Sequence, residues 1–252
     1  MKKINLYILL SILVSFSACK KDEDETPVVA NGSVMFHMHS AADTTEIENY
    51  GDTIYLSSGR MMIVDLAKMY ISNIRLVKAD GSEVSPDVTK ILQQQGTEEY
   101  ELGSVPSGNY KTVKFDIGLS NADNASIPSA SNAVLYQPSM WFGATAQPDG
   151  FVFVNLQGTI DTSSAMDGSG MHPFVYEIGT VANRVTVTLP DEPFTVSPNA
   201  EAMVHMEVNY AKIIEGLDLS DETNLNISTP SDNTRTAAST IVTNIEDMVE
   251  YE

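Results

Sequence analysis

The strongest constraint on this chain is the alternation of apolar and polar residues in short segments from Asn31 onward. A period of two is typical of β-strands that bury one face. Glycine, proline, asparagine and aspartate separate the segments, as expected for turns. The predicted strands are Ser33–His39, Thr53–Leu56, Met61–Leu66, Tyr70–Val77, Tyr110–Leu119, Phe151–Ile160, Phe174–Ile178, Arg184–Leu189 and Ala202–Tyr210.

These strands are not followed regularly by long helices, which argues against a parallel α/β sheet. They predict an all-β domain over residues 31–252, an antiparallel β-sandwich of immunoglobulin-like or similar type. Apolar residues recur with helical spacing only near the end of the chain, so a short C-terminal helix is predicted for residues 236–250. The polar segments Asn121–Gln137 and Asp161–Gly170 are expected to be surface loops.

The first residues have the pattern of a targeting segment. Residues 1–18 combine two lysines, an apolar stretch, and the small residues Ser17 and Ala18 directly before Cys19. That order is typical of a signal peptide, and its end resembles a bacterial lipobox. We expect cleavage before Cys19 and acylation of this cysteine, which would anchor the protein in a membrane. The alternative is an ordinary secretory signal followed by a chance cysteine.

Residues 19–30 form a polar, acidic tether between this signal and the predicted domain. Acidic residues directly after the lipidated cysteine resemble the surface-export signal of Bacteroidetes lipoproteins. The resemblance implies an outer membrane lipoprotein exposed at the cell surface. The alternative is a plain spacer on a lipoprotein that faces the periplasm.

Composition narrows the classes of function. The chain has 14 lysines and arginines against 34 aspartates and glutamates, a net charge of −20, which argues against nucleic acid as a partner. It contains no P-loop, no G-x-S-x-G and no H-E-x-x-H, so the chain is not expected to be an enzyme. A surface glycan-active enzyme stays as an alternative, because so many acids supply a carboxylate pair by chance.

Histidine and methionine gather on the first and last predicted strands. Alternation places one methionine and two histidines on the polar face of the first strand, and a methionine, a histidine and Glu207 on that of the last. First and last strands are often neighbours in a sandwich, which would unite the two sets. Imidazole and thioether groups suit copper, and the thioether favours Cu(I). The candidate copper ligands are Met35, His37, His39, Met203 and His205. The alternative is that the histidines face solvent and the methionines fill gaps in the core.

Five segments between residues 32 and 250 resemble, in the same order, the MbnP-like family, named for a periplasmic copper-binding protein encoded with methanobactin. They are Lys68–Leu76 with Asp80-Gly81, Val105–Gly118, Met140–Gly158, Phe174–Gly179 and Asn244–Met248. The resemblance implies a β-sandwich outside the cytoplasm that handles copper.

The family also implies a role for the single tryptophan. There, a tryptophan oxidised to kynurenine by a partner dihaem enzyme joins histidine in binding copper. Trp141 lies in the matching segment, so the resemblance implies an oxidised Trp141 and a dihaem peroxidase-like partner. Glu177, however, stands where the family has histidine, and His172 is not at a matching position. The alternative is that Trp141 anchors a loop or the core.

Together these features predict a lipid-anchored extracytoplasmic protein that binds or acquires copper through its first and last strands rather than at Trp141. The alternative is a surface adhesion or ligand-binding module of the same fold without metal.

Overall fold

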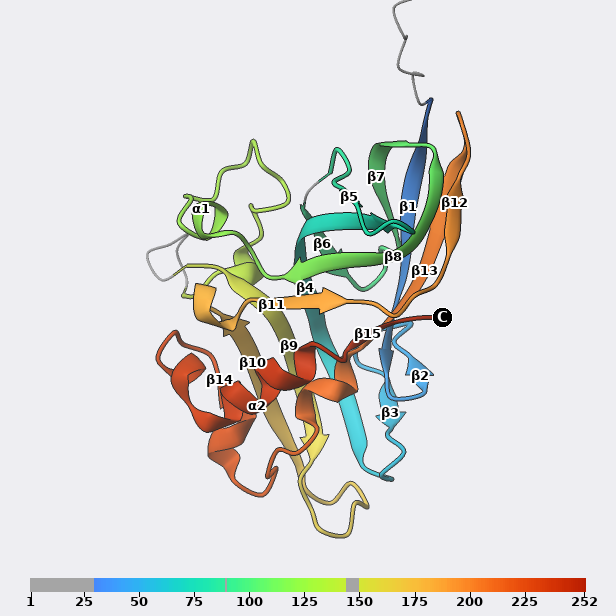
Figure 1. Cartoon of the computed structure of the whole chain (residues 1–252). Helices are drawn as coiled ribbons and strands as arrows, with labels where there is room; N and C mark the ends of the chain where they lie inside the picture. The colour runs from blue at the N-terminus through green and yellow to red at the C-terminus, as the bar shows by residue number, and fades with distance from the viewer. Residues whose placement is uncertain (1–29, 89, 144–149) are drawn as a thin grey trace, which may run out of the picture.

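The computed structural model describes residues 30–88, 90–143 and 150–252, and their strands form two sheets (Figure 1). Five strands form sheet A: β1 (Asn31–Ala42), β2 (Thr45–Glu46), β7 (Glu99–Pro106), β13 (Glu201–Asn209) and β15 (Val249–Tyr251). Their order is β15-β13-β1-β2, with β7 also paired to β1. The predicted signal peptide, Cys19 and all of the tether except its last residue lie outside the described residues.

Ten strands form sheet B: β3 (Thr53–Tyr55), β4 (Met61–Lys78), β5 (Glu83–Val84), β6 (Lys90–Gln94), β8 (Gly108–Ile117), β9 (Val152–Asp161), β10 (Met171–Gly179), β11 (Val185–Thr188), β12 (Phe194–Val196) and β14 (Asn226–Ile227). The main path through this sheet is β11-β8-β4-β9-β10-β14. The predicted all-β, sandwich-like class is therefore confirmed.

Most neighbouring strands are antiparallel, as predicted, but β1 and β13 run parallel and in register from Ser33 to Ala41. Parallel strands cannot be joined by a hairpin, so a long connection must separate them in sequence. Here that connection includes nearly all of sheet B. Figure 1 shows β1, β13 and β12 side by side, with the C-terminal residues close to β13.

Sheet B contains one strand where the sequence predicted two. The segments Met61–Leu66 and Tyr70–Val77 belong to the continuous strand β4, and the pairing register shifts between Val64 and Leu66. Asp65, which interrupts the apolar pattern, lies exposed at this shift. A bulge lets the strand continue through a break in alternation, which is why the local pattern suggested an end.

Helical structure is limited in the described residues. It consists of α1 (Asn121–Asn124), α2 (Thr236–Ile245), and the 3₁₀ turns η1 (Pro138–Met140), η2 (Val181–Asn183), η3 (Tyr210–Ile214), η4 (Glu222–Leu225) and η5 (Asp232–Thr234). None of these helices is long and apolar enough to cross a membrane.

The C-terminal helix predicted for residues 236–250 is present as α2 but ends at Ile245, earlier than predicted. The backbone then turns away, because the Met248 carbonyl accepts a hydrogen bond from the Asn209 amide at 2.7 Å. Residues 249–251 form β15, which pairs with the edge of β13. Pairing with sheet A satisfies backbone groups that a longer helix would otherwise have bonded internally.

The main core lies between the sheets, and a second apolar layer covers the other face of sheet B. Alternation on β4 separates the two, since Met69 and Ile71 belong to the main core and Tyr70 to the second layer. The second layer joins strand residues to the segment that follows β8. Its members are Tyr70, Leu92, Leu119, Leu135, Met140, Trp141, Phe151 and Phe153.

Two glycines, Gly118 and Gly179, let this second layer approach the strands. A Cβ on Gly118 would lie 2.6 Å from the Phe153 ring, and Gly118 also has a φ of +121°. A Cβ on Gly179 would lie 2.5 Å from the Phe151 carbonyl oxygen. A side chain at either position would push the aromatic residues away from the sheet.

Replacing Phe36 by alanine is expected to destabilise the domain strongly. Phe36 is fully buried on β1, between the outward-facing Met35 and His37. Loss of a buried phenyl ring typically costs about 3–5 kcal/mol of unfolding free energy. Tyr55→Ala is the control, because Tyr55 is 64% exposed and should change stability by less than about 0.5 kcal/mol. Urea denaturation measures both, and equal losses would contradict the placement of β1.

Candidate metal site

The outward faces of β1 and β13 carry a ladder of paired side chains, which we call the donor ladder. The alternate residues of both strands are buried in the main core, so the remaining ones project away from it. Because the strands are parallel and in register, similar donors stand opposite one another. The successive pairs are Met35 with Met203, His37 with His205, and His39 with Glu207. The structure thus places all five predicted ligands on one face.

The His37 imidazole contacts those of His39 and His205. The ring centroid of His37 lies 4.4 Å from that of His39 and 5.0 Å from that of His205, both in edge-on arrangements. The side chains of His37 and His39 are 19% and 22% exposed, and that of His205 is 49% exposed. The Nδ1 atom of His37 is buried and has no hydrogen-bond partner within the described part of the chain. Such an atom costs free energy unless a ligand satisfies it.

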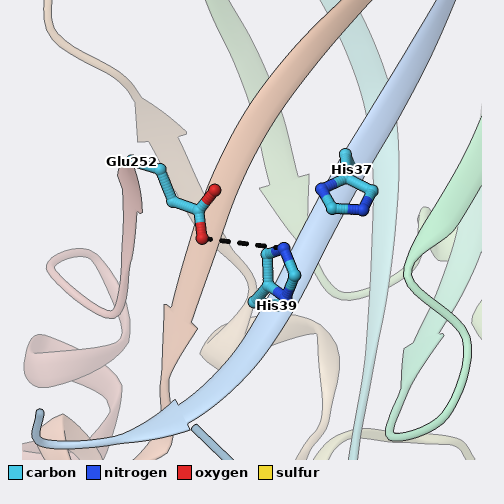
Figure 2. A group of neighbouring side chains, drawn as sticks. All are labelled: His37, His39 and Glu252. Carbon is cyan, nitrogen blue, oxygen red and sulfur yellow. Dashed lines mark ion pairs between the residues drawn. The ribbon is translucent and has the colours of Figure 1, made fainter. Parts of the chain in front are cut away.

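The Glu252 carboxylate joins two of these histidines. Its Oε1 lies 3.7 Å from Nε2 of His39, and its Oε2 lies 3.8 Å from Nδ1 of His205. Figure 2 shows the imidazoles of His37 and His39 projecting from β1, with the Glu252 carboxylate pointing toward His39. One ligand atom from each of His37, His39 and Glu252 lies within 4.8 Å of the others. Nitrogen and oxygen ligands bind a metal at about 2.0–2.2 Å, so small side-chain rotations would bring these atoms onto one ion.

The other ring nitrogen of His39 faces two further carboxylates. Its Nδ1 lies 3.2 Å from Oε1 of Glu46 and 4.0 Å from Oε2 of Glu98. In metal sites, a histidine ligand commonly donates its second ring N–H to a carboxylate, which fixes the tautomer and the ring orientation. Glu46 is placed to do this for His39, and Nε2 would then be free to bind a metal beside Glu252.

The ladder lies in a negatively charged environment. Burial raises the pKa of Glu207, and the nearby charges of Glu250 and Glu252 raise it further. Carboxylates that repel one another in this way favour a bound cation, because the cation relieves the repulsion.

Sequence reasoning missed the three carboxylates that surround the imidazoles. Glu46 belongs to the two-residue strand β2, Glu98 precedes β7, and Glu252 follows the three-residue strand β15. The strands β2 and β15 have too few residues for a period to be detected, and Glu98 lies outside any strand. Of the three carboxylates, only Glu252 left a signal in the sequence, because apolar and acidic residues alternate over residues 249–252.

His172, the remaining histidine, does not join the ladder. It lies on β10 in sheet B, where its side chain is 42% exposed and its Nδ1 is 4.0 Å from a carboxylate oxygen of Glu222.

Trp141 lies in the second apolar layer, on the side of the sandwich opposite the donor ladder. It is only 6% exposed and forms an isolated β-bridge with Phe151. The Nδ2 of Asn155 holds the preceding turn by donating to the Ser139 carbonyl at 2.6 Å. The indole Nε1 is buried without a hydrogen-bond partner among the described residues. This position agrees with the alternative prediction that Trp141 is a core anchor.

Glu177 faces the same side of sheet B as Trp141. It pairs with Asn155 on β9, which in turn pairs with Lys68 on β4. Burial raises the pKa of Glu177 to about 7 and lowers the pKa of Lys68. The residue at position 177 is therefore a carboxyl group that readily carries a proton.

The family model described as MbnP matches residues 31–233 of this chain. This chain belongs to the MbnP family. A solved structure, MbnP from Methylosinus trichosporium, matches with a TM-score of 0.53 over 76% of this chain and 80% of that chain. The two are 17% identical, so this likeness establishes the MbnP fold alone. A search of curated proteins found no match. The MbnP range includes His37, His39 and His205, whereas Glu252 lies beyond it.

Glu177→Gln is expected to stabilise the MbnP domain at alkaline pH. The folded state raises the pKa of Glu177 from 4.5 to about 7, so it favours the protonated form. The contribution of Glu177 to the free energy of unfolding is therefore fully present below about pH 4.5 and is lost as the pH rises through 7. At pH 8 the free energy of unfolding of the glutamine variant should exceed that of wild type by roughly 1 kcal/mol, after allowance for solvent screening. At pH 4.5 the two should be almost equal.

Thermal unfolding at the two pH values measures this difference. Glu48→Gln is the control, because Glu48 is exposed. A gain for Glu177→Gln that is the same at both pH values would contradict the assignment.

Proposed function

We propose that this MbnP-family protein binds copper outside the cytoplasm, through the donor ladder of β1 and β13. The observation that carries the proposal is the register, which sets His37 opposite His205 beside His39 and Glu252. Three imidazoles and a carboxylate on one face form a donor set that binds divalent transition metals. Within the Irving–Williams order, Cu²⁺ binds such sites more tightly than the other first-row ions do.

The two ends of the ladder suit different oxidation states of copper. Met35 and Met203 supply thioethers at one end, and Met203 is 42% exposed. Soft thioethers favour Cu(I), whereas the imidazoles and carboxylates toward His39 suit Cu(II). A binding protein that meets copper in either state could use both ends, which supports a role in copper acquisition.

The kynurenine chemistry that the family implies is a separate part of the proposal. Oxidation of Trp141 by a dihaem peroxidase-like partner would act on a buried side chain on the other side of sheet B. Glu177 is a harder ligand than imidazole and serves Cu(I) poorly. We therefore assign copper binding to the donor ladder and not to Trp141, whether or not the indole is oxidised.

We further propose that the protein acts by binding rather than by catalysis, and that Cys19 anchors it at the outer membrane. The chain carries none of the catalytic motifs considered above, and its histidines are grouped with thioethers and carboxylates as a ligand set. The acidic tether supports exposure at the cell surface, and a location facing the periplasm is the alternative.

Copper titration of metal-free protein without a histidine tag tests the site. Wild type should bind Cu²⁺ at micromolar concentrations, and His37→Ala combined with His205→Ala should weaken binding by about tenfold or more. Trp141→Phe should leave the affinity unchanged. His172→Ala is the matched control, because it removes a histidine outside the ladder.

Two results would overturn parts of this proposal. If wild type binds no copper, the protein is better explained as an adhesion or ligand-binding module without metal. If Trp141→Phe alone abolishes binding, the copper site lies in the second apolar layer instead.

Cys19→Ala is expected to release the protein from membranes when it is expressed in a Gram-negative host. Wild type should incorporate labelled palmitate and sediment with the outer membrane, because two or three acyl chains give stable anchoring. The variant should do neither. Retention of label and of membrane association by the variant would contradict the lipobox, and protease treatment of intact cells separates surface exposure from a periplasmic location.

A further inference from the structure

A pocket with a volume of about 240 Å³ opens beside the donor ladder and shares side chains with it. Its wall includes Phe194, Met203, Tyr251, Glu192, His205 and Glu252. His205 and Glu252 belong to the group of imidazoles and carboxylates described above, and their closest atoms are 3.8 Å apart. A molecule in the pocket would therefore touch the side chains that we assign to the metal.

The apolar part of the wall is held rigidly. The Phe194 ring stacks on Tyr110, with centroids 5.4 Å apart and planes 15° from parallel. The Tyr251 hydroxyl accepts a hydrogen bond from the Val113 amide at 3.1 Å and lies 3.3 Å from Oγ1 of Thr112. Both rings therefore have partners within the fold, and the pocket is present in the structure without a ligand. An apolar cavity of about 150 Å³ holds a benzene molecule, so this one has room for an aromatic ring.

The charges of the pocket select against anions. Glu192 and Glu252 contribute carboxylates to the wall. The nearby Lys111 forms an ion pair with Asp191 at 3.6 Å and is not part of the wall. A neutral or cationic aromatic group fits these surroundings, whereas a carboxylate on the ligand would face like charge.

We propose that this pocket binds a small neutral or cationic aromatic ligand that carries its own metal-donor atom, and that the ligand completes the coordination of the metal on the ladder. The inference rests on the proposed copper binding. His37, His39 and Glu252 offer three ligand atoms within 4.8 Å of one another, and His205 stands outside this group, in the wall of the pocket. Sites with three protein ligands leave a position for an external one. The shared wall brings that external ligand to the same side chains.

The test compares imidazole with 4-phenylimidazole as ligands of the protein loaded with Cu²⁺. Both carry the same donor nitrogen, but only the second can place a ring against Phe194 and Tyr251. It should bind about tenfold more tightly than imidazole, as expected for partial burial of a phenyl group. A third probe, 4-(imidazol-4-yl)benzoate, should lose this gain because of Glu192. Electron paramagnetic resonance reports ligation of the copper, and calorimetry gives the affinities.

Phe194→Ala should abolish the preference for 4-phenylimidazole while leaving copper binding unchanged, since Phe194 is not part of the ladder. Phe194→Leu is the second variant, which keeps an apolar side chain on β12 if the alanine variant does not fold. The leucine variant should reduce the preference for 4-phenylimidazole over imidazole.

The outcomes separate the two proposals. Copper binding without any preference between the probes overturns the pocket and leaves the metal site standing. Equal binding of 4-phenylimidazole with and without copper overturns the role of its donor atom. Failure of the wild type to bind copper overturns both proposals.

Discussion

The parallel, in-register pairing of β1 with β13 is the interaction on which the donor ladder depends. A slip of one residue would turn every side chain of a strand to the opposite face of the sheet. The register is held by apolar burial, because Phe36 and Met38 on β1 and Met206 on β13 are fully buried. The histidines face one another because their apolar neighbours cannot leave the core. The apolar residues that form the core therefore also determine which candidate ligands face one another.

The two outward faces of the sandwich offer very different surroundings. Sheet B is covered on its outer side by the apolar layer that contains Trp141, and Gly118 and Gly179 allow that layer to lie close to the strands. Sheet A carries partly exposed imidazoles and carboxylates instead. A buried indole and a partly exposed set of ligands suit different reactions, which is why we propose sheet A for copper binding.

Part of the excess of acidic residues surrounds the imidazoles on the outer face of sheet A. Glu46, Glu98 and Glu252 come from three separate parts of the chain, and each lies within 4.0 Å of an imidazole nitrogen. A surface that concentrates negative charge attracts cations and raises their local concentration. The position of Glu252 depends in turn on β15, which is held to β13 by strand pairing and to β8 through the Tyr251 hydroxyl.

The sequence alone determined which residues lie inside and which lie outside each long strand. Alternation is a local property, so it identified the all-β class and the polar faces that carry His37 and His205, while five local segments carried the resemblance to the family. Helical spacing identified α2 for the same reason. What local patterns do not contain is the partner of each strand, its direction and its register. Those depend on contacts between residues far apart in the chain, where loop closure and burial of the whole core decide the arrangement. Only the tertiary structure could therefore decide that β1 and β13 run parallel, that Glu252 meets His39, and that Trp141 lies on the opposite side of the sandwich.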